Sequence, residues 1–270
     1  MATFLPIRTP NAIDQAVFVV KLSQKIGETQ LAELKQLENI LSDEFPHFSE
    51  VKLQGVMMGA DGGTTSLNNR VIGIECRSGV TQQEHMLNGE RSDWVLRVSE
   101  DSIQINCLNY TDWSSVASYV CSLLDKVFGC ISSDNLMIVG VNFQVNDAFV
   151  VKDTIDDIDY TQLFNHSKYL TGNAWNIGLL WHVNSGWFVE DTEYERVLQV
   201  LNISTRTDET QSVKLIVLIE HMQQYTMSSV IPVESKNELL QKVFGELHSN
   251  NKELMKELVV PNIKENIGLT

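Results

Sequence analysis

The densest group of side chains that could do chemistry is a run of carboxylates in the second half of the chain. It comprises Asp153, Asp156, Asp157 and Asp159, within the sequence DTIDDIDY. Crowded carboxylates can bind a hard cation, but the ligand spacing of an EF-hand loop is absent. Apolar residues alternate with the acids, as on a half-buried segment. We therefore interpret the run as a solvated loop face, with a partner-binding patch and, less favoured, a metal site as the alternatives.

No other combination of residues matches a catalytic or metal-binding pattern. The glycine-rich stretch GADGGTT lacks the Gly-Lys-Ser/Thr ending of a phosphate-binding loop, and there is no G-x-S-x-G nucleophile motif. The six histidines include no H-E-x-x-H pair, although His182 and His221 lie in predicted strands and could be neighbours. Packed histidines are the simpler interpretation. The sequence thus predicts no catalytic residue, no metal ligands and no cofactor.

Aromatic residues are concentrated in the second half of the chain. Trp175, Trp181 and Trp187 are accompanied by Phe188 and Tyr194. Packing in the core is the default explanation for such residues. The functional alternative is an exposed aromatic patch that binds a partner, because Trp and Tyr dominate the binding hot spots of protein interfaces. Trp175 and Trp187 are the candidates for such a patch.

The charge of the chain restricts its partners. Its 35 acidic and 20 basic residues give a formal net charge of -15. Affinity for nucleic acid depends mostly on Lys and Arg neutralising phosphates, so this balance argues against direct nucleic-acid binding. A basic protein partner is compatible with it, and so is a charge that only aids solubility.

Cysteine usage and hydropathy indicate the compartment. Cys76, Cys107, Cys121 and Cys130 have no metal-type spacing, and we interpret them as reduced, packed thiols. The first residues contain no apolar stretch of the kind found in signal peptides. No apolar run approaches the roughly 20 residues that span a bilayer. We expect a cytoplasmic protein with no membrane contact.

The elements that must position these residues are clearest in the middle of the chain. Alternation of apolar and polar residues predicts a hairpin with strands at 93–99 and 103–107. A helix should follow, with an apolar stripe that includes Val116, Val120 and Leu123. Thr111 or Asp112 supplies a side-chain oxygen for the helix start. Because the apolar face of a hairpin needs a cover, we expect this helix to pack on it, with Trp94 and Leu123 both buried.

The flanking segments complete the predicted fold. Strands are expected at 16–22, 51–58, 70–77, 136–145, 176–183, 196–204 and 212–221, with helices at 29–45, around 160–164 and after a capping box of Ser235 and Glu238. This order predicts an α+β protein with mainly antiparallel sheets in two similar halves, 1–133 and 134–270, each covered by amphipathic helices. One continuous domain is the alternative. The similarity of the halves could reflect a duplication, or only the way that meandering α+β proteins look.

Several short motifs are distributed over most of the chain. They are PNAIDQAVFVVKL followed by a helix ending at Phe45-Pro46, the strand start Asp93-Trp94, Tyr110-Thr111-Asp112-Trp113, and Leu247-His248 with Asn250-Asn251-Lys252. Together they resemble the motifs of a sporadically distributed bacterial family of about this length, whose function is not assigned. The resemblance implies a link to mobile or defence-associated genes. It implies no catalytic residue.

Two functional hypotheses remain open from the sequence. The first is a non-enzymatic, acidic, cytosolic protein that binds a protein partner, as an accessory or neutralising component of a small bacterial defence or toxin-antitoxin cassette. A homodimer is also left open. The second is an enzyme or small-ligand sensor with a pocket between sheet and helices. A pocket lined by convergent His, Asp and Arg would favour the second hypothesis.

Overall fold

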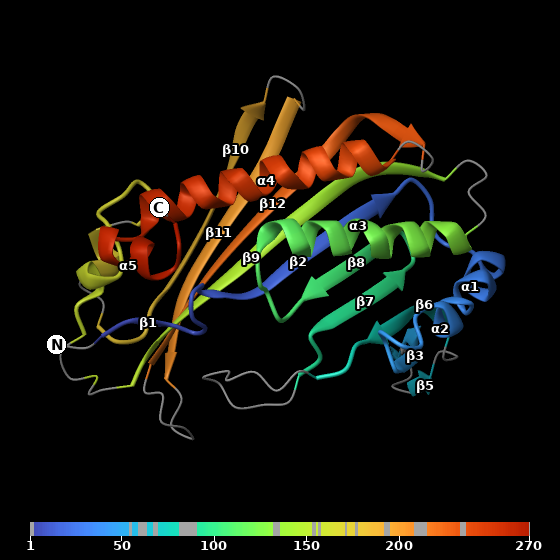
Figure 1. Cartoon of the computed structure of the whole chain (residues 1–270), viewed down its shortest axis with the longest axis horizontal. Helices are drawn as coiled ribbons and strands as arrows, with labels where there is room; N and C mark the ends of the chain where they lie inside the picture. The colour runs from blue at the N-terminus through green and yellow to red at the C-terminus, as the bar shows by residue number, and fades with distance from the viewer. Residues whose placement is uncertain are drawn as a thin grey trace.

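One large antiparallel sheet forms the framework of the molecule, and the helices α3 and α4 lie across one of its faces (Figure 1). The computed structural model describes every residue except 1–2, 54–55, 59–63, 67–69, 81–90, 132–135, 153–154, 156–157, 171, 176–177, 192–194, 208–214, 233–235 and 270. Ten strands of the described residues form the sheet. They are β1 (Leu5–Pro6), β2 (Ile13–Leu22), β3 (His47–Leu53), β6 (Arg70–Arg77), β7 (Trp94–Ser99), β8 (Ser102–Cys107), β9 (Met137–Val151), β10 (His182–Asp191), β11 (Glu195–Thr207) and β12 (Leu215–Pro232).

The remaining elements are helices and one small sheet, in which β4 (Val56–Met58) pairs with β5 (Thr64–Ser66). The helices are α1 (Glu28–Leu34), α2 (Leu37–Ile40), α3 (Trp113–Cys130), α4 (Lys236–Leu258) and α5 (Pro261–Asn266), with 3-10 turns η1 (Tyr160–Gln162) and η2 (Gly172–Trp175). The predicted α+β class with a mainly antiparallel sheet is confirmed. No helix of the described residues is both long enough and apolar enough to cross a membrane.

The pair β2 and β9 forms the centre of the sheet. The strand order is β10-β11-β12-β9-β2-β8-β7-β6-β3, and Phe18 of β2 lies opposite Phe143 of β9. On both sides of this pair the chain follows one order of elements. A first strand is followed by a helical segment, then by an antiparallel meander that returns beside the first strand, and finally by a long helix. The sheet therefore runs without interruption through residues from before and after position 133.

The predicted hairpin and helix form as their sequence patterns indicate. The apolar stripe of α3 is buried, and Leu123 is part of a core cluster as predicted. The prediction that Trp94 is also buried is wrong, because Trp94 is half-buried and packs against the edge of that cluster. The side chain of Asp112 caps the helix, since its Oδ1 accepts a hydrogen bond from the backbone N–H of Ser115 at 3.0 Å. This satisfies one of the free N–H groups at the helix start.

Three predicted elements differ from the structure. The strand expected at 51–58 is divided between β3, which ends at Leu53, and β4, which pairs with β5 in the small sheet. The helix expected over 29–45 is divided into α1 and α2, although its apolar face is buried as expected. The strand expected at 176–183 begins instead at His182 and continues to Asp191. Side chains from other elements hold the preceding residues: Tyr160 donates to the carbonyl of Leu179 at 2.7 Å, and Thr205 Oγ1 accepts from the N–H of Trp181 at 2.8 Å. A single backbone bond, from Thr205 N to the Trp181 carbonyl at 3.0 Å, accompanies them, and the regular pairing of β10 with β11 starts at His182. Ser235 of the predicted capping box lies outside the described residues.

All four cysteines are buried, and none forms a disulfide. Burial raises the pKa of Cys76 and that of Cys107 to about 12. Both groups are therefore thiols at neutral pH, and they behave as small apolar side chains in the core.

The core on the helix-covered side has two main clusters. The first core cluster contains the apolar side chains between α3 and strands β2, β7 and β8, together with Leu240 and Leu247 of α4. The second core cluster contains Leu254 and Leu258 of α4, with residues of β12, η1 and α5. The helix α4 therefore passes from one cluster to the other along its length.

Candidate functional site

A layer of buried polar side chains separates the two core clusters. On β9, for example, Asp147 lies between Val145 of the first cluster and Phe149 of the second. The same change occurs on β11, β12 and α4, so polar residues of four elements meet at one level of the core. We call this set the polar layer, and its members are Asp147, Gln199, His221, Gln223 and Asn251. Polar groups at such depth are costly to bury unless they find partners.

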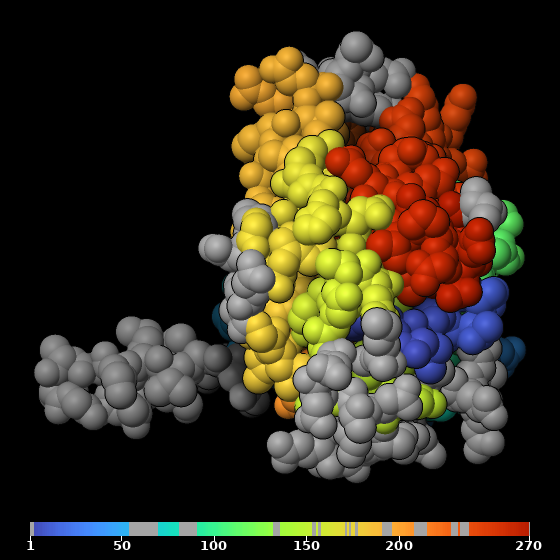
Figure 2. All heavy atoms as spheres, turned by 90° about the vertical axis from the view of Figure 1, so that its left-hand side faces the viewer, coloured from blue at the N-terminus to red at the C-terminus, as the bar shows by residue number. Residues whose placement is uncertain are grey.

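A cavity of about 290 Å³ opens at one end of the polar layer. It lies where the beginning of β2 and the middle of β9 meet the start of α3 and the end of α4. Figure 2 shows the N-terminal residues in blue beside the C-terminal residues in red, and the cavity lining draws on both. The lining residues are Pro10–Ile13, Tyr110, Thr111, Trp113, Asp147, His248, Asn251, Lys252, Met255 and 267–269.

Asp147 is the most unusual group in the cavity. Asp147 is only 4% exposed to solvent, and no described residue forms a hydrogen bond or ion pair with its carboxylate. Burial, together with the nearby carboxylate of Asp14, raises the pKa of Asp147 to about 7. The carboxylate therefore lines the cavity without a partner from the described chain. Desolvation without compensation is the ordinary cause of such a rise.

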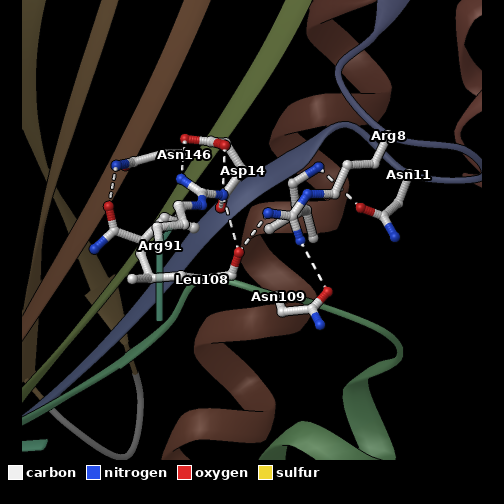
Figure 3. Close-up of polar contacts among 9 residues, drawn as sticks. Arg8, Asn11, Asp14, Arg91, Leu108, Asn109 and Asn146 are labelled. Atoms are coloured by element: carbon white, nitrogen blue, oxygen red, sulfur yellow. Dashed lines mark hydrogen bonds and ion pairs between the residues drawn. The ribbon is translucent and has the colours of Figure 1, made fainter. Parts of the chain in front are cut away.

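Asp14 occupies an irregular position in the neighbouring strand. The pairing of β2 with β9 shifts between Ile13 and Gln15, so Asp14 has no register partner on β9. Its carboxylate accepts a hydrogen bond from Arg91 Nη2 at 2.7 Å, and the same nitrogen donates to the backbone oxygen of Asp14 at 2.7 Å. Figure 3 shows this contact. The bulge thus gives Asp14 a cationic partner that Asp147 lacks.

Two arginines converge on the carbonyl of Leu108, two residues before the cavity residue Tyr110 (Figure 3). Arg91 Nη2 donates to the oxygen of Leu108 at 2.9 Å, and Arg8 Nη2 donates to the same oxygen. Arg8 Nη1 also donates to Asn109 Oδ1 at 3.1 Å. These bonds hold residues 108–109 against the start of β2. The arginines therefore fix the segment that brings Tyr110 and Thr111 to the cavity.

A histidine and a tryptophan form the wall between the two long helices. The ring of His248 on α4 stacks on Trp113 at the start of α3, with 4.0 Å between ring centroids and 5° between planes. Burial, together with the charge of Lys252, lowers the pKa of His248 to about 4. Burial also raises the pKa of Tyr110. At neutral pH the cavity therefore presents a neutral imidazole and a phenol that keeps its proton.

The polar layer continues from the cavity as a chain of hydrogen bonds. His221 Nδ1 lies 2.8 Å from Asn251 Oδ1, and His221 Nε2 lies 2.7 Å from Gln199 Oε1. Burial lowers the pKa of His221 to about 4, so its ring is neutral at physiological pH. Gln223 Nε2 donates to the carbonyl oxygen of Leu247, which ties β12 to α4.

The far end of this chain reaches a second hollow, the Trp187 groove. It has a volume of about 430 Å³ and is lined by Tyr169, Trp187, Gln199, His221, Glu253 and Glu257, among others. The rings of Trp187 and Tyr169 are 5.3 Å apart, and Trp187 lies nearly parallel to His221 at 6.5 Å. The groove therefore combines aromatic faces with carboxylates at the end of α4.

The structure places the predicted partner-binding residues in different surroundings. Asp153, Asp156 and Asp157 lie outside the described residues. Asp159 caps η1, accepting from Thr161 N at 2.9 Å and from Thr161 Oγ1 at 2.6 Å, and these bonds lower its pKa.

The two candidate tryptophans make separate aromatic contacts. Trp175 is half-buried against the second core cluster, 4.4 Å from the ring of His166. Trp187 lines the groove that bears its name. A partner-binding role for either residue stays a prediction.

The sequence reasoning did not find the residues of the cavity, although a signal for Asp147 is present. Val141, Phe143 and Val145 share the core-facing phase of β9, and the next residue in that phase is Asp147. A polar residue at a core-facing position is a departure that needs a reason. Tyr110, Asn251 and His248 carry no such signal, because several elements must come together before they share one cavity.

The cavity brings together three stretches that are far apart in the sequence, around residues 10–13, 110–113 and 248–252. A scan against protein-family models finds no match for the chain, and a search of curated proteins finds none either. The chemistry of the site is therefore the guide to function. The cavity offers one unpaired carboxylate, neutral hydrogen-bonding groups and apolar walls.

Proposed function

We propose that this protein binds a small molecule in the cavity at Asp147. The observation that carries the proposal is the buried carboxylate that lines the cavity without a partner among the described residues. An unpaired buried charge costs several kcal/mol of folding stability. Groups that are unfavourable for stability and lie in a hollow are characteristic of binding sites, where a ligand supplies the missing interactions.

The geometry of the cavity supports ligand binding better than it supports catalysis. A general base is normally oriented by a second side chain that is hydrogen-bonded to it. No described residue plays that part for Asp147, and the imidazole of His248 is engaged in its stack on Trp113. The proposal therefore corresponds to the small-ligand sensor of the two sequence-based hypotheses, rather than to an enzyme.

A ligand screen tests this proposal. Purified protein is heated with a library of small molecules, charged and neutral, and the unfolding temperature is measured for the native chain, for Asp147→Asn and for the exposed control Asp159→Asn. The expected result is a group of compounds that stabilise the native and Asp159→Asn proteins but not Asp147→Asn. If every stabilising compound acted equally on all three, the cavity would not be the binding site.

A protein partner is the second candidate, and the Trp187 groove is the feature that favours it. Trp187 offers an aromatic face for a basic side chain, beside Glu253 and Glu257, which pair with Lys256 and Lys168 of the same chain. The net charge of -15 would steer a basic protein toward the surface. We also propose that the interface includes Trp175, Asp159 and the three aspartates outside the described residues. The same proposal includes a cytoplasmic location and a role as a neutralising component of a defence cassette, and it leaves room for a homodimer.

A pull-down from the host organism tests the partner proposal. Once a partner is named, its association rate is measured against ionic strength for the native protein, for Trp187→Ala and for the protein with Asn at positions 153, 156, 157 and 159. A slower rate and a flatter salt dependence in the Asn variant would place the acidic run in the interface. Unchanged rates in both variants would remove these residues from it.

The proposed pair of similar halves bears on the cavity. The common order of elements around β2 and β9 supports two halves, 1–133 and 134–270, each with its own covering helix. In that arrangement the cavity lies where the halves meet, since Ile13 comes from the first and Asp147 from the second. Separately expressed halves that recombine into one soluble complex would support this arrangement, and a complex that fails to form would count against it.

A further inference from the structure

Resting on the proposed function, we propose that the ligand of the cavity is a small protonated amine whose ammonium group binds the carboxylate of Asp147. The inference concerns the charge and size of the ligand, and it follows from what the cavity provides and what it lacks. The carboxylate is an acceptor for several hydrogen bonds, and a buried carboxylate is best compensated by a donor that is itself charged.

The described chain does not supply that donor. Lys252 lines the same cavity, yet it forms no ion pair with Asp147. Arg8 and Arg91 do not line the cavity and are directed at the carbonyl of Leu108 and at Asp14. The position beside the Asp147 carboxylate is therefore left for a cation from outside the described chain.

Other ligand classes fit less well. An anionic ligand would be repelled by Asp147 and by Asp14. A neutral hydroxyl would leave the buried charge uncompensated. A divalent metal ion such as Ca²⁺ takes six or more oxygen ligands. No group of three or more His, Cys, Asp or Glu side chains with metal-binding geometry is present among the described residues.

The walls of the cavity indicate the body of the ligand. Ala12, Ile13 and Met255 are apolar and suit the hydrocarbon part of an amine, while the indole of Trp113, stacked on His248, adds a flat aromatic wall. A volume of about 290 Å³ lies at the lower end of the range for ligand pockets. Since liquid water takes about 30 Å³ per molecule, the space holds a compact molecule and excludes a polymer.

The pH dependence of binding follows from the same geometry. The groups around Asp147 are Asp14 on β2, Tyr110 before α3, and His248 and Lys252 on α4. His248 is neutral and Tyr110 is protonated between pH 6 and pH 8. The pKa of Asp147 is about 7 in the empty cavity. An ammonium ion binds the ionised carboxylate, so affinity should rise about tenfold from pH 6 to pH 8, with proton release on binding.

Calorimetric titration with three probes of similar shape provides the test. The probes are n-butylamine, n-butanol and butyrate, each titrated at pH 6 and pH 8 into native protein, Asp147→Asn and the control Asp43→Asn, an exposed residue that lines neither hollow. We expect butylamine to bind the native and Asp43→Asn proteins about tenfold more tightly at pH 8. In Asp147→Asn the affinity should fall at least tenfold and lose its pH dependence.

The outcomes separate the inference from the proposed function. Butanol or butyrate binding as tightly as butylamine, with the loss confined to Asp147→Asn, would overturn the amine but keep the cavity as a ligand site. Butylamine binding equally to Asp147→Asn would overturn the inference as well. Failure of all three probes would also reject a simple amine, and the broader library screen would then decide whether the cavity binds any ligand. The pH dependence of the native protein tests the inference even if a variant misfolds.

Discussion

The core beneath α3 and the core beneath the C-terminal part of α4 differ in what they bury. Under α3 the contacts with β7 and β8 are apolar, and Leu123 is fully buried among them. Under α4 the polar layer interrupts the core, with His221 and Gln223 almost inaccessible to solvent. Both helices follow an antiparallel meander of the same sheet. One helix therefore covers an apolar core, whereas the other covers a core that also contains polar and titratable side chains.

The largest change in stability should come from a substitution in the apolar core beneath α3. Leu123→Ala removes a fully buried side chain from the first core cluster and should lower the free energy of unfolding by about 2–5 kcal/mol. Chemical denaturation measures this change. The control is Ser122→Ala on the exposed face of the same helix, which should change stability by less than about 0.5 kcal/mol. An unchanged midpoint for Leu123→Ala would contradict the packing of α3 on the sheet.

Asp147→Asn should raise the free energy of unfolding of the ligand-free protein, which is the opposite of the change expected for Leu123→Ala. The pKa of Asp147 is raised from 3.8 to about 7, so folding opposes its ionisation. The resulting cost is absent below pH 3.8, grows as the pH rises toward 7 and is constant above that. The variant should therefore be more stable than the native protein at pH 8, by on the order of 2–4 kcal/mol, and nearly equal at pH 4.

Thermal and chemical unfolding across this pH range would check the prediction for Asp147. The exposed variant Asp159→Asn serves as the control, because it should not reproduce the growing gap. A difference between the native protein and Asp147→Asn that does not change with pH would contradict the buried, unpaired state of the carboxylate.

His221→Leu should destabilise the fold by about 1–3 kcal/mol at neutral pH, because it leaves the buried amides of Gln199 and Asn251 without their partner. The variant should also lose stability less steeply in acid. The pKa of His221 is lowered from 6.5 to about 4, so the native protein loses the corresponding stability as the pH falls through that range. If the stability of the two proteins fell equally between pH 6.5 and pH 4, His221 would not be buried in its neutral form.

The smallest effect is expected at Gln223, the other fully buried polar residue of β12. Its Oε1 has no hydrogen-bond partner among the described residues, while its Nε2 donates to the carbonyl of Leu247. Gln223→Leu should therefore change stability by less than about 1 kcal/mol, since the lost bond is offset by removing an unsatisfied oxygen. Chemical denaturation of Gln223→Leu and of His221→Leu, each compared with the native protein, measures the two changes in the free energy of unfolding. A loss as large as that for His221 would mean that the polar layer acts as one unit.

The framework could be predicted from the sequence because it depends on local periodicity. The hairpin around Asp101 and the stripe of α3 each express their pattern within a few residues. The strand at 182–191 was misplaced because Tyr160 and Thr205, distant in sequence, hold the residues before it. The cavity was not predictable for a related reason. Asp147, Tyr110 and His248 are separated along the chain, and only the order of strands in the sheet brings them together.

The chain of hydrogen bonds through His221 has a consequence for how its two ends are connected. A neutral imidazole carries one proton, so it donates at one nitrogen and accepts at the other. If Asn251 presents its oxygen to Nδ1, that nitrogen carries the proton, and Gln199 must turn its NH₂ group to Nε2. If Asn251 turns around, the tautomer changes and Gln199 must turn as well. The atom that Asn251 offers in the cavity therefore determines the atom that Gln199 offers in the Trp187 groove, without any movement of the backbone.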